Sequence, residues 1–143
     1  MQTKDQQKLT IFTDGGSRGN PGPAAVGVAF FEGETEVFRL GQCIGNQTNN
    51  VAEYQAFLLS LSELKMRMTK NQPSSIQWYL DSKLVVEQLN QRWKIKDPNL
   101  KVLWQTAISE LSQLGVPYSI SHIPREENTL ADKMVNQALD GLT

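Results

Sequence analysis

Four carboxylates in this 143-residue chain lie where an element of secondary structure is expected to begin or end: Asp14, Glu53, Asp81 and Asp132. Carboxylates that converge on one spot repel each other unless cations lie among them, and hard divalent ions such as Mg²⁺ prefer oxygen ligands. Two such ions, about 3.5–4 Å apart, can activate a water on one side of a phosphodiester and stabilise the leaving oxygen on the other. If the four carboxylates meet, they predict phosphoryl-transfer chemistry.

Each carboxylate also has an ordinary structural explanation. An aspartate followed by glycine, as at Asp14, is a strong signal for a hairpin turn. Glu53 fits a capping box, in which it would bond back to a backbone amide at the start of a helix. Asp81 or Ser82 could cap the next helix, and Asp132 could favour the positive end of another. These explanations stay open for each residue alone, so only their joint placement favours a site.

The hydrophobic pattern predicts the elements that would position the carboxylates. Alternating apolar residues predict strands, and apolar residues spaced by three and four predict amphipathic helices. The order is βββαβααβα. The expected strands are residues 8–14, 24–31, 35–44, 75–80 and 116–120, and the expected helices cover residues 54–68, 83–91, 99–114 and 128–139.

This order favours an α/β fold built on a mixed five-stranded sheet flanked by helices. The first three strands are expected to form an antiparallel meander, and strands one, four and five to lie parallel. Asp14 and Asp81 then follow parallel strands at their carboxyl ends, where open sheets gather ligands. The expected topology therefore supports a shared acidic site.

The composition is that of one globular domain covering residues 1–143, with a flexible N-terminus at residues 1–7. Hydrophobic residues make up 39% of the chain and charged residues 20%. The sequence contains no long apolar run, which predicts a soluble, non-secreted, cytoplasmic protein without membrane contact. The single cysteine, Cys43, excludes an internal disulfide and a cysteine-based zinc site, and is expected to be a small core residue.

The net charge of −1 excludes a uniformly basic surface, but positive charge is concentrated in residues 83–101. This segment holds five basic and two acidic residues. Such a run is often a solvated helix face, and it can also grip a polyanion.

Five motifs, in order and at family-like spacing, resemble those of the type 1 ribonuclease H family, which hydrolyses the RNA strand of RNA/DNA hybrids. The resemblance covers residues 9 to about 139 and includes the element order. The motifs are IFTDGG at 11–16, GNPGP at 19–23, TNNVAE at 48–53, LDS at 80–82, and HIPREEN at 122–128 followed by AD at 131–132.

The resemblance implies two Mg²⁺ ions, with Mn²⁺ as a possible substitute, and a role for each acidic residue. Asp14 would bridge both ions, Glu53 and Asp81 would complete the ion nearer the leaving group, and Asp132 would hold the ion that presents the attacking water. His122 matches the family's loop histidine, which helps proton movement or product departure. The alternative interpretation of His122 is a surface loop residue without a catalytic role.

Family positions that contact the hybrid are matched as well. Asn20, Asn49 and Asn50 match positions that contact the minor groove, and Thr48 matches a position near a phosphate of the DNA strand. The alternative for the asparagines is turn formation, since asparagine is common in turns. Glycines 15, 16, 19 and 22 would let the backbone approach the RNA strand. The full expected binding set is Gly15, Gly16, Ser17, Arg18, Asn20, Thr48, Asn49, Asn50, Ser82, Lys83, Trp93, Lys94 and Lys96.

The chain departs from many relatives in lacking a long basic insertion after Asp81, where it has only residues 93–98. Trp93 could stack on a sugar or fill the core. Lys83, Lys94 and Lys96 would provide the electrostatic grip, together with Arg92, and we expect weaker hybrid binding than in relatives with the insertion.

The expected activity is metal-dependent endonucleolytic cleavage of the RNA strand, leaving 3′-hydroxyl and 5′-phosphate ends, by a monomer without an obligate protein partner. Two alternatives remain: a non-catalytic module that binds hybrid or double-stranded RNA, and a core of integrase or transposase type. The four acids argue against the first, because unused paired acids are costly. The asparagine-rich segment at residues 48–50 fits hybrid recognition better than the second.

Overall fold

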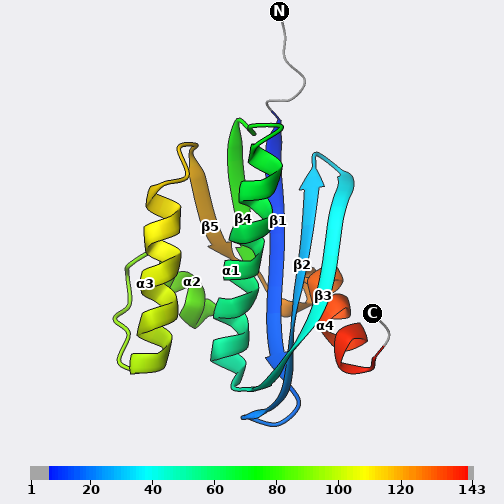
Figure 1. Ribbon diagram of the computed structural model, residues 1–143, viewed down its shortest axis with the longest axis vertical. Coiled ribbons are helices and arrows are strands. Elements are labelled where there is room, and N and C mark those ends of the chain that lie inside the picture. The colour runs from blue at the N-terminus through cyan, green and yellow to red at the C-terminus, as the bar shows by residue number, and fades with distance from the viewer. Residues whose placement is uncertain (1–6, 142–143) are drawn as a thin grey trace, which may run out of the picture.

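Strand β1 (Lys8–Ser17) lies at the centre of a five-stranded sheet in the computed structural model, which describes residues 7–141 (Figure 1). The sheet order is β3-β2-β1-β4-β5. Most of the N-terminal segment expected to be flexible, residues 1–6, lies outside the described residues. The other strands are β2 (Gly22–Glu32), β3 (Thr35–Gln47), β4 (Ser75–Leu80) and β5 (Tyr118–His122).

The strand directions confirm the expected mixed sheet. β2 pairs antiparallel with β1 and with β3, whereas β4 pairs parallel with β1 and with β5. The helices are α1 (Asn49–Met68), α2 (Lys83–Leu89), α3 (Pro98–Ser112) and α4 (Thr129–Leu139), with a short 3-10 turn at Arg125–Glu127.

Helices cover both faces of the sheet (Figure 1). α1 packs on β1 and β2 with α3 beside it, whereas α4 packs on β1, β2 and β3 from the other side. The main core lies under α1, where Tyr54, Phe57, Leu61 and Leu64 are fully buried against Trp78 of β4. A smaller cluster lies under α4, as its apolar pattern predicts. The sheet is thus held rigidly between two layers of helix.

Three details of the expected elements are wrong. β1 continues through Gly15, which pairs with Val26 of β2, so the Asp-Gly pair is not the hairpin turn. The turn lies instead at residues 18–21. β5 ends at His122 rather than at residue 120, so the histidine is the last strand residue. Cys43 is exposed on β3, with its thiol donating to the carbonyl of Ala138, and is not a core residue.

None of the helices within residues 7–141 is both long enough and apolar enough to span a membrane.

Candidate active site

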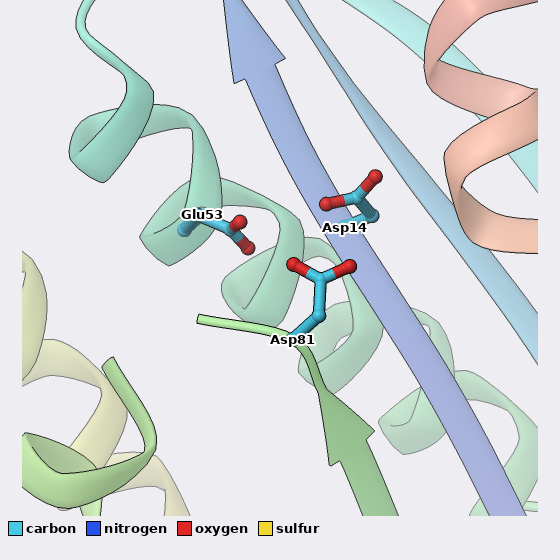
Figure 2. Close-up of side chains that lie close together, drawn as sticks. All are labelled: Asp14, Glu53 and Asp81. Atoms are coloured by element: carbon cyan, nitrogen blue, oxygen red, sulfur yellow. The ribbon is translucent and has the colours of Figure 1, made fainter. Parts of the chain in front are cut away.

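Asp14, Glu53 and Asp81 converge on one point, as Figure 2 shows. Each offers a carboxylate oxygen, and these oxygens all lie within 4.8 Å of one another. Asp14 comes from β1, Glu53 from α1, and Asp81 from the residue after β4. Three segments far apart in the sequence therefore supply one acidic cluster.

The parallel pairing of β1 and β4 places the two aspartates side by side. This pairing ends at Thr13 and Leu80, so Asp14 and Asp81 are the next residue on each strand. Because both strands run in the same direction, their next residues emerge at the same edge of the pairing.

Gly15 brings the glutamate to the aspartates. A Cβ at Gly15 would lie 2.2 Å from the backbone carbon of Ala52, so only glycine lets α1 approach β1 this closely. Ala52 directly precedes Glu53, and the close contact therefore sets the position of that carboxylate. The expectation that Gly15 makes room for RNA missed this reason, which is packing of α1.

Asp132 lies on the wall of the same cleft, outside the group of three. The cleft has a volume of ≈ 400 Å³ and is lined by all four carboxylates. Arg125 lies 3.4 Å from Oδ1 of Asp132, and the side-chain amide of Asn136 donates to its Oδ2 at 3.4 Å. Asp132 is half-buried in the first turn of α4, where its charge also favours the helix N-terminus.

The electrostatics of the cluster are those of crowded, buried acids. Burial, followed by repulsion from Asp81 and Asp132, raises the pKa of Asp14 from 3.8 to about 8, while Arg125 lowers it. Burial and the charges of Asp14 and Asp81 likewise raise the pKa of Glu53 well above its usual range. Negative charge in this cluster is therefore unfavourable without a positive counter-charge.

The donor set fits a divalent cation. Oε1 of Glu53 is buried and has no hydrogen-bond partner within the described part of the chain. An unpartnered buried carboxylate oxygen is costly unless a cation faces it. Hard oxygen ligands in this number suit Mg²⁺ or Mn²⁺.

Asn128 is a residue of the site to which the sequence assigned no role. It is 1% exposed, and its amide donates to the carbonyl of Thr13 at 2.9 Å and to Oδ2 of Asp81 at 3.0 Å. It also directly precedes α4, the helix that carries Asp132. The sequence offered two signals: Asn128 ends the motif at residues 122–128, and it stands at a helix start, which suggests a cap. Its side chain makes no cap hydrogen bond.

The helix-cap explanations are resolved for two of the acids. Thr48 caps α1 by accepting from the amide of Val51 at 3.2 Å, so the expected capping box with Glu53 is wrong. Ser82 caps α2 by accepting from the amide of Val85 at 3.3 Å, which leaves Asp81 to face the cluster. Thr48 and Ser82 thus have structural roles whatever else they contact.

His122 is exposed and does not line the acidic cleft. It borders a neighbouring groove between α2 and β5, which includes Lys83 and Glu87. A hydrogen bond from Arg92 lowers the pKa of Glu87 in this groove. The histidine therefore lies beside the site, and its role stays a prediction.

The asparagine-rich loops form one network. Oδ1 of Asn20 accepts from the amide of Asn49 at 3.0 Å, and Oδ1 of Asn49 accepts from the amide of Ser17 at 2.9 Å. Because these bonds use the two carbonyl oxygens, the amide NH₂ groups are the part of each side chain that would donate to a ligand acceptor. Asn50 is exposed in the first turn of α1. Arg18 forms an ion pair with Asp140 at 2.7 Å on the rim of the cleft.

The remaining glycines of this segment serve different ends. A Cβ at Gly22 would lie 2.2 Å from the carbonyl oxygen of Arg18, so Gly22 permits the tight turn itself. Gly19 has φ of +98°, which favours glycine. A Cβ at Gly16 would meet only a side-chain carbon of Val135 at 3.8 Å.

The loop between α2 and α3 is short, running only from residue 90 to 97. Trp93 is 46% exposed, so its alternative as a core residue is wrong. It lines a surface groove of ≈ 450 Å³ with Lys94 and Trp104. Lys83, Lys94 and Lys96 are all exposed.

Comparison with known proteins gives consistent matches. The family description "RNase H" matches residues 6–140. A bifunctional protein of Mycobacterium tuberculosis is 40% identical over 93% of this chain, and "Ribonuclease HI" of Halobacterium salinarum is 38% identical over 93%. The chain spans only 36% and 65% of those relatives' lengths. The crystal structure of LC11-RNase H1 in complex with RNA/DNA hybrid superposes with a TM-score of 0.88 at 37% identity, covering 93% of this chain and 97% of that one.

Proposed function

The chain belongs to the RNase H family, and from this membership and the acidic cluster we propose that it cuts the RNA strand of RNA/DNA hybrids. The observation that carries the proposal is the convergence of Asp14, Glu53 and Asp81 within 4.8 Å at the end of the β1/β4 pairing. The hybrid bound to LC11-RNase H1, a similar structure, supports the choice of substrate.

We assign the metal ligands by position. Asp14 lies between the other acids and would hold both of two Mg²⁺ ions, with Glu53 and Asp81 on one side and Asp132 on the other. When bound, the ions would activate a water and neutralise charge on the leaving oxygen, which would leave 3′-hydroxyl and 5′-phosphate ends. Asn128 holds Asp81 in place, and Arg125 keeps Asp132 near the cleft wall. Mn²⁺ is the expected substitute.

The substrate residues are assigned from their placement around the cleft. Asn20, Asn49 and Asn50 are assigned to the minor groove, and the first two form a hydrogen-bond network with Ser17 beside the cleft. Asn50 and Thr48 stand at the exposed start of α1, and Lys83 and His122 border the groove beside the cluster. We assign His122 to proton movement or product departure, since an imidazole can both accept and donate a proton.

The protein is proposed to act as a monomer in the cytoplasm, with residues 1–143 forming one catalytic domain. Because the chain spans only part of the length of several relatives, these statements concern this domain.

The experiment is side-by-side digestion of RNA/DNA hybrid, double-stranded RNA and DNA duplex in Mg²⁺ and in Mn²⁺. Wild type is expected to cut only the RNA strand of the hybrid, and Asp14→Asn is expected to cut nothing. Binding without cleavage would favour a non-catalytic module, and cleavage of the DNA duplex would favour an integrase-type core. End-labelled products distinguish 5′-phosphate from 3′-phosphate ends.

A further inference from the structure

Gln88 is a buried polar residue that the proposed mechanism does not use. It lies in α2 and is 4% exposed. Its Oε1 accepts from the hydroxyl of Tyr54 at 2.6 Å, its Nε2 donates to the carbonyl of Lys94 at 3.5 Å, and its own carbonyl accepts from Nε1 of Trp104 at 2.8 Å. One residue thus joins α1, the loop at residues 90–97, and α3.

The loop is held from one side by backbone hydrogen bonds to α2. The amides of Arg92 and Trp93 donate to the carbonyl of Glu87 at 2.9 and 3.3 Å. The side chain of Arg92 also pairs with the Glu87 carboxylate at 2.7 Å. These contacts fix the start of the loop, and Asp97 fixes its end by capping α3.

The middle of the loop is also tied to Gln88. Trp93 and Lys94 are exposed, so core packing does not hold their side chains. The amide of Gln88 donates to the carbonyl of Lys94, and the next residue, Ile95, packs against the core. Gln88 therefore adds a polar contact to the backbone directly after Trp93, whose own amide bonds to Glu87.

The carbonyl oxygen of the Gln88 side chain bonds to Tyr54, the residue that follows Glu53 in α1. Tyr54 is fully buried. Its hydroxyl donates to Oε1 of Gln88 at 2.6 Å. The loop is therefore tied to the turn of α1 that carries an expected metal ligand.

We propose that Gln88 is a positioning residue for nucleic-acid binding, which holds Trp93 and Lys94 in register with the turn of α1 that carries Glu53. The inference rests on the proposed function, because it assumes that residues 93–96 bind the DNA strand that is paired with the cleaved RNA. A residue that only stabilises the fold would contribute the same bonds without affecting substrate affinity, and this is the alternative to test.

The test uses Gln88→Met, which keeps the length of the side chain and removes its amide. With RNA/DNA hybrid, we expect KM to rise about fivefold and kcat to change less than about twofold, since uniform binding is lost. Amide hydrogen exchange of residues 92–96 is expected to quicken by about tenfold in the free protein, because the loop loses a tie.

Gln77→Met is the matched control. The amide of Gln77 donates to Ser121 at 3.0 Å and its carbonyl oxygen accepts from Ser119, so it also joins neighbouring elements, β4 and β5. It is expected to lower the melting temperature without changing KM or exchange in the loop. If Gln88→Met does not fold, Tyr54→Phe removes one of the same bonds and should give the same pattern, weaker.

The outcomes separate the two ideas. An unchanged KM in Gln88→Met, or an equal rise of KM in Gln77→Met, overturns the positioning role. If the wild type cuts the hybrid in the same assay, the proposed function still stands. A wild type that cuts no hybrid refutes the proposed function; Gln88 is then judged by hybrid affinity, measured from tryptophan fluorescence, and unchanged affinity in Gln88→Met overturns its role. A double variant with Lys94→Ala is expected to show less than additive loss, because Gln88 acts through that residue.

Discussion

At the scale of single residues, the carboxylate of Asp14 is buried among other acids, where a negative charge is unfavourable. It is 6% exposed, and its pKa is raised from 3.8 to about 8 by burial first and by its acidic neighbours second. A carboxyl group with a raised pKa binds its proton in the folded state over a pH range where the unfolded chain has lost it. The acidic cluster thus makes stability depend on pH and on cations.

The sign of this dependence gives the first prediction. Without divalent metal, the contribution of Asp14 to the free energy of unfolding is full where Asp14 is protonated in both states, and it falls as pH rises from about 4 to about 8. Urea titrations across this range in EDTA should show the fall. Asp14→Asn should reduce it, and saturating Mg²⁺ should reverse it by favouring the ionised form. Stability that rises steadily over the same range would contradict the account.

Asn128 gives a second prediction at this scale. Asn128→Ala leaves the carbonyl of Thr13 without its donor and lets Asp81 move. We expect a loss of about 1–3 kcal/mol in the free energy of unfolding. Residues that orient metal ligands typically affect activity by about 10- to 100-fold, so kcat should fall by that order.

Asn90→Ala is the control for Asn128→Ala. The amide of Asn90 donates to the carbonyl of Ile120 at 2.9 Å, which is a similar tie away from the carboxylates. It should lower stability and leave kcat and the Mg²⁺ concentration for half-maximal activity near wild-type values. If both variants lose kcat equally, Asn128 serves the fold alone.

At the scale of elements, the distance between α1 and β1 decides whether the site exists. Gly15 and Gly16 are neighbours in β1, but only Gly15 faces the backbone of α1. The two glycines look equivalent in the sequence. In the structure, the packing of α1 requires glycine at position 15, whereas position 16 has room for a side chain.

The third prediction compares Gly15→Ala with Gly16→Ala. The first places a methyl group 2.2 Å from the carbonyl of Ala52, so α1 must shift; overpacking of this kind costs about 1–3 kcal/mol or more. The second meets only Val135 at 3.8 Å and should change stability by less than about 0.5 kcal/mol. Urea denaturation of both variants measures the difference, and equal losses would contradict the close contact of α1.

The same scale shows what the sequence could predict. The order of elements and the buried stripe of α1 rest on local periodicity, and the parallel β1/β4 pair rests on the order of elements; all three are confirmed. The expected topology placed Asp14 and Asp81 at one edge of the sheet, whereas the role of Glu53 came from the family resemblance.

Features that depend on distant contacts could not be predicted. The tie from Asn128 to Thr13 joins residues 115 positions apart, and the clash that makes Gly15 necessary involves a helix 37 residues later in numbering, at Ala52. The extension of β1 past the Asp-Gly pair likewise depends on its pairing with β2 rather than on turn propensity. Local signals place the acids, and tertiary contacts fix how they meet.

At the scale of the whole molecule, there is no overall excess of positive charge, and the position of each basic residue matters more than their number. The chain has a net charge of −1, so affinity for a polyanion must come from a local patch. Exposed Lys94 and Lys96 lie on the loop between α2 and α3, whereas Lys70 lies just after the far end of α1, beyond its last residue Met68 (Figure 1). Lys70 is exposed like Lys94 and Lys96, so it differs from them only in its position on the molecule.

This difference gives the last prediction. Neutralising a lysine that contacts a phosphate reduces the dependence of affinity on salt, by about 0.9 in the slope of log K against log salt for each contact. Lys94→Ala and Lys96→Ala should each weaken hybrid binding and reduce this slope by about that amount, whereas Lys70→Ala should change neither. Fluorescence anisotropy with labelled hybrid in EDTA, from low to physiological salt, measures binding without cleavage. Equal effects at all three positions would mean that the whole surface, and not the short loop, attracts the hybrid.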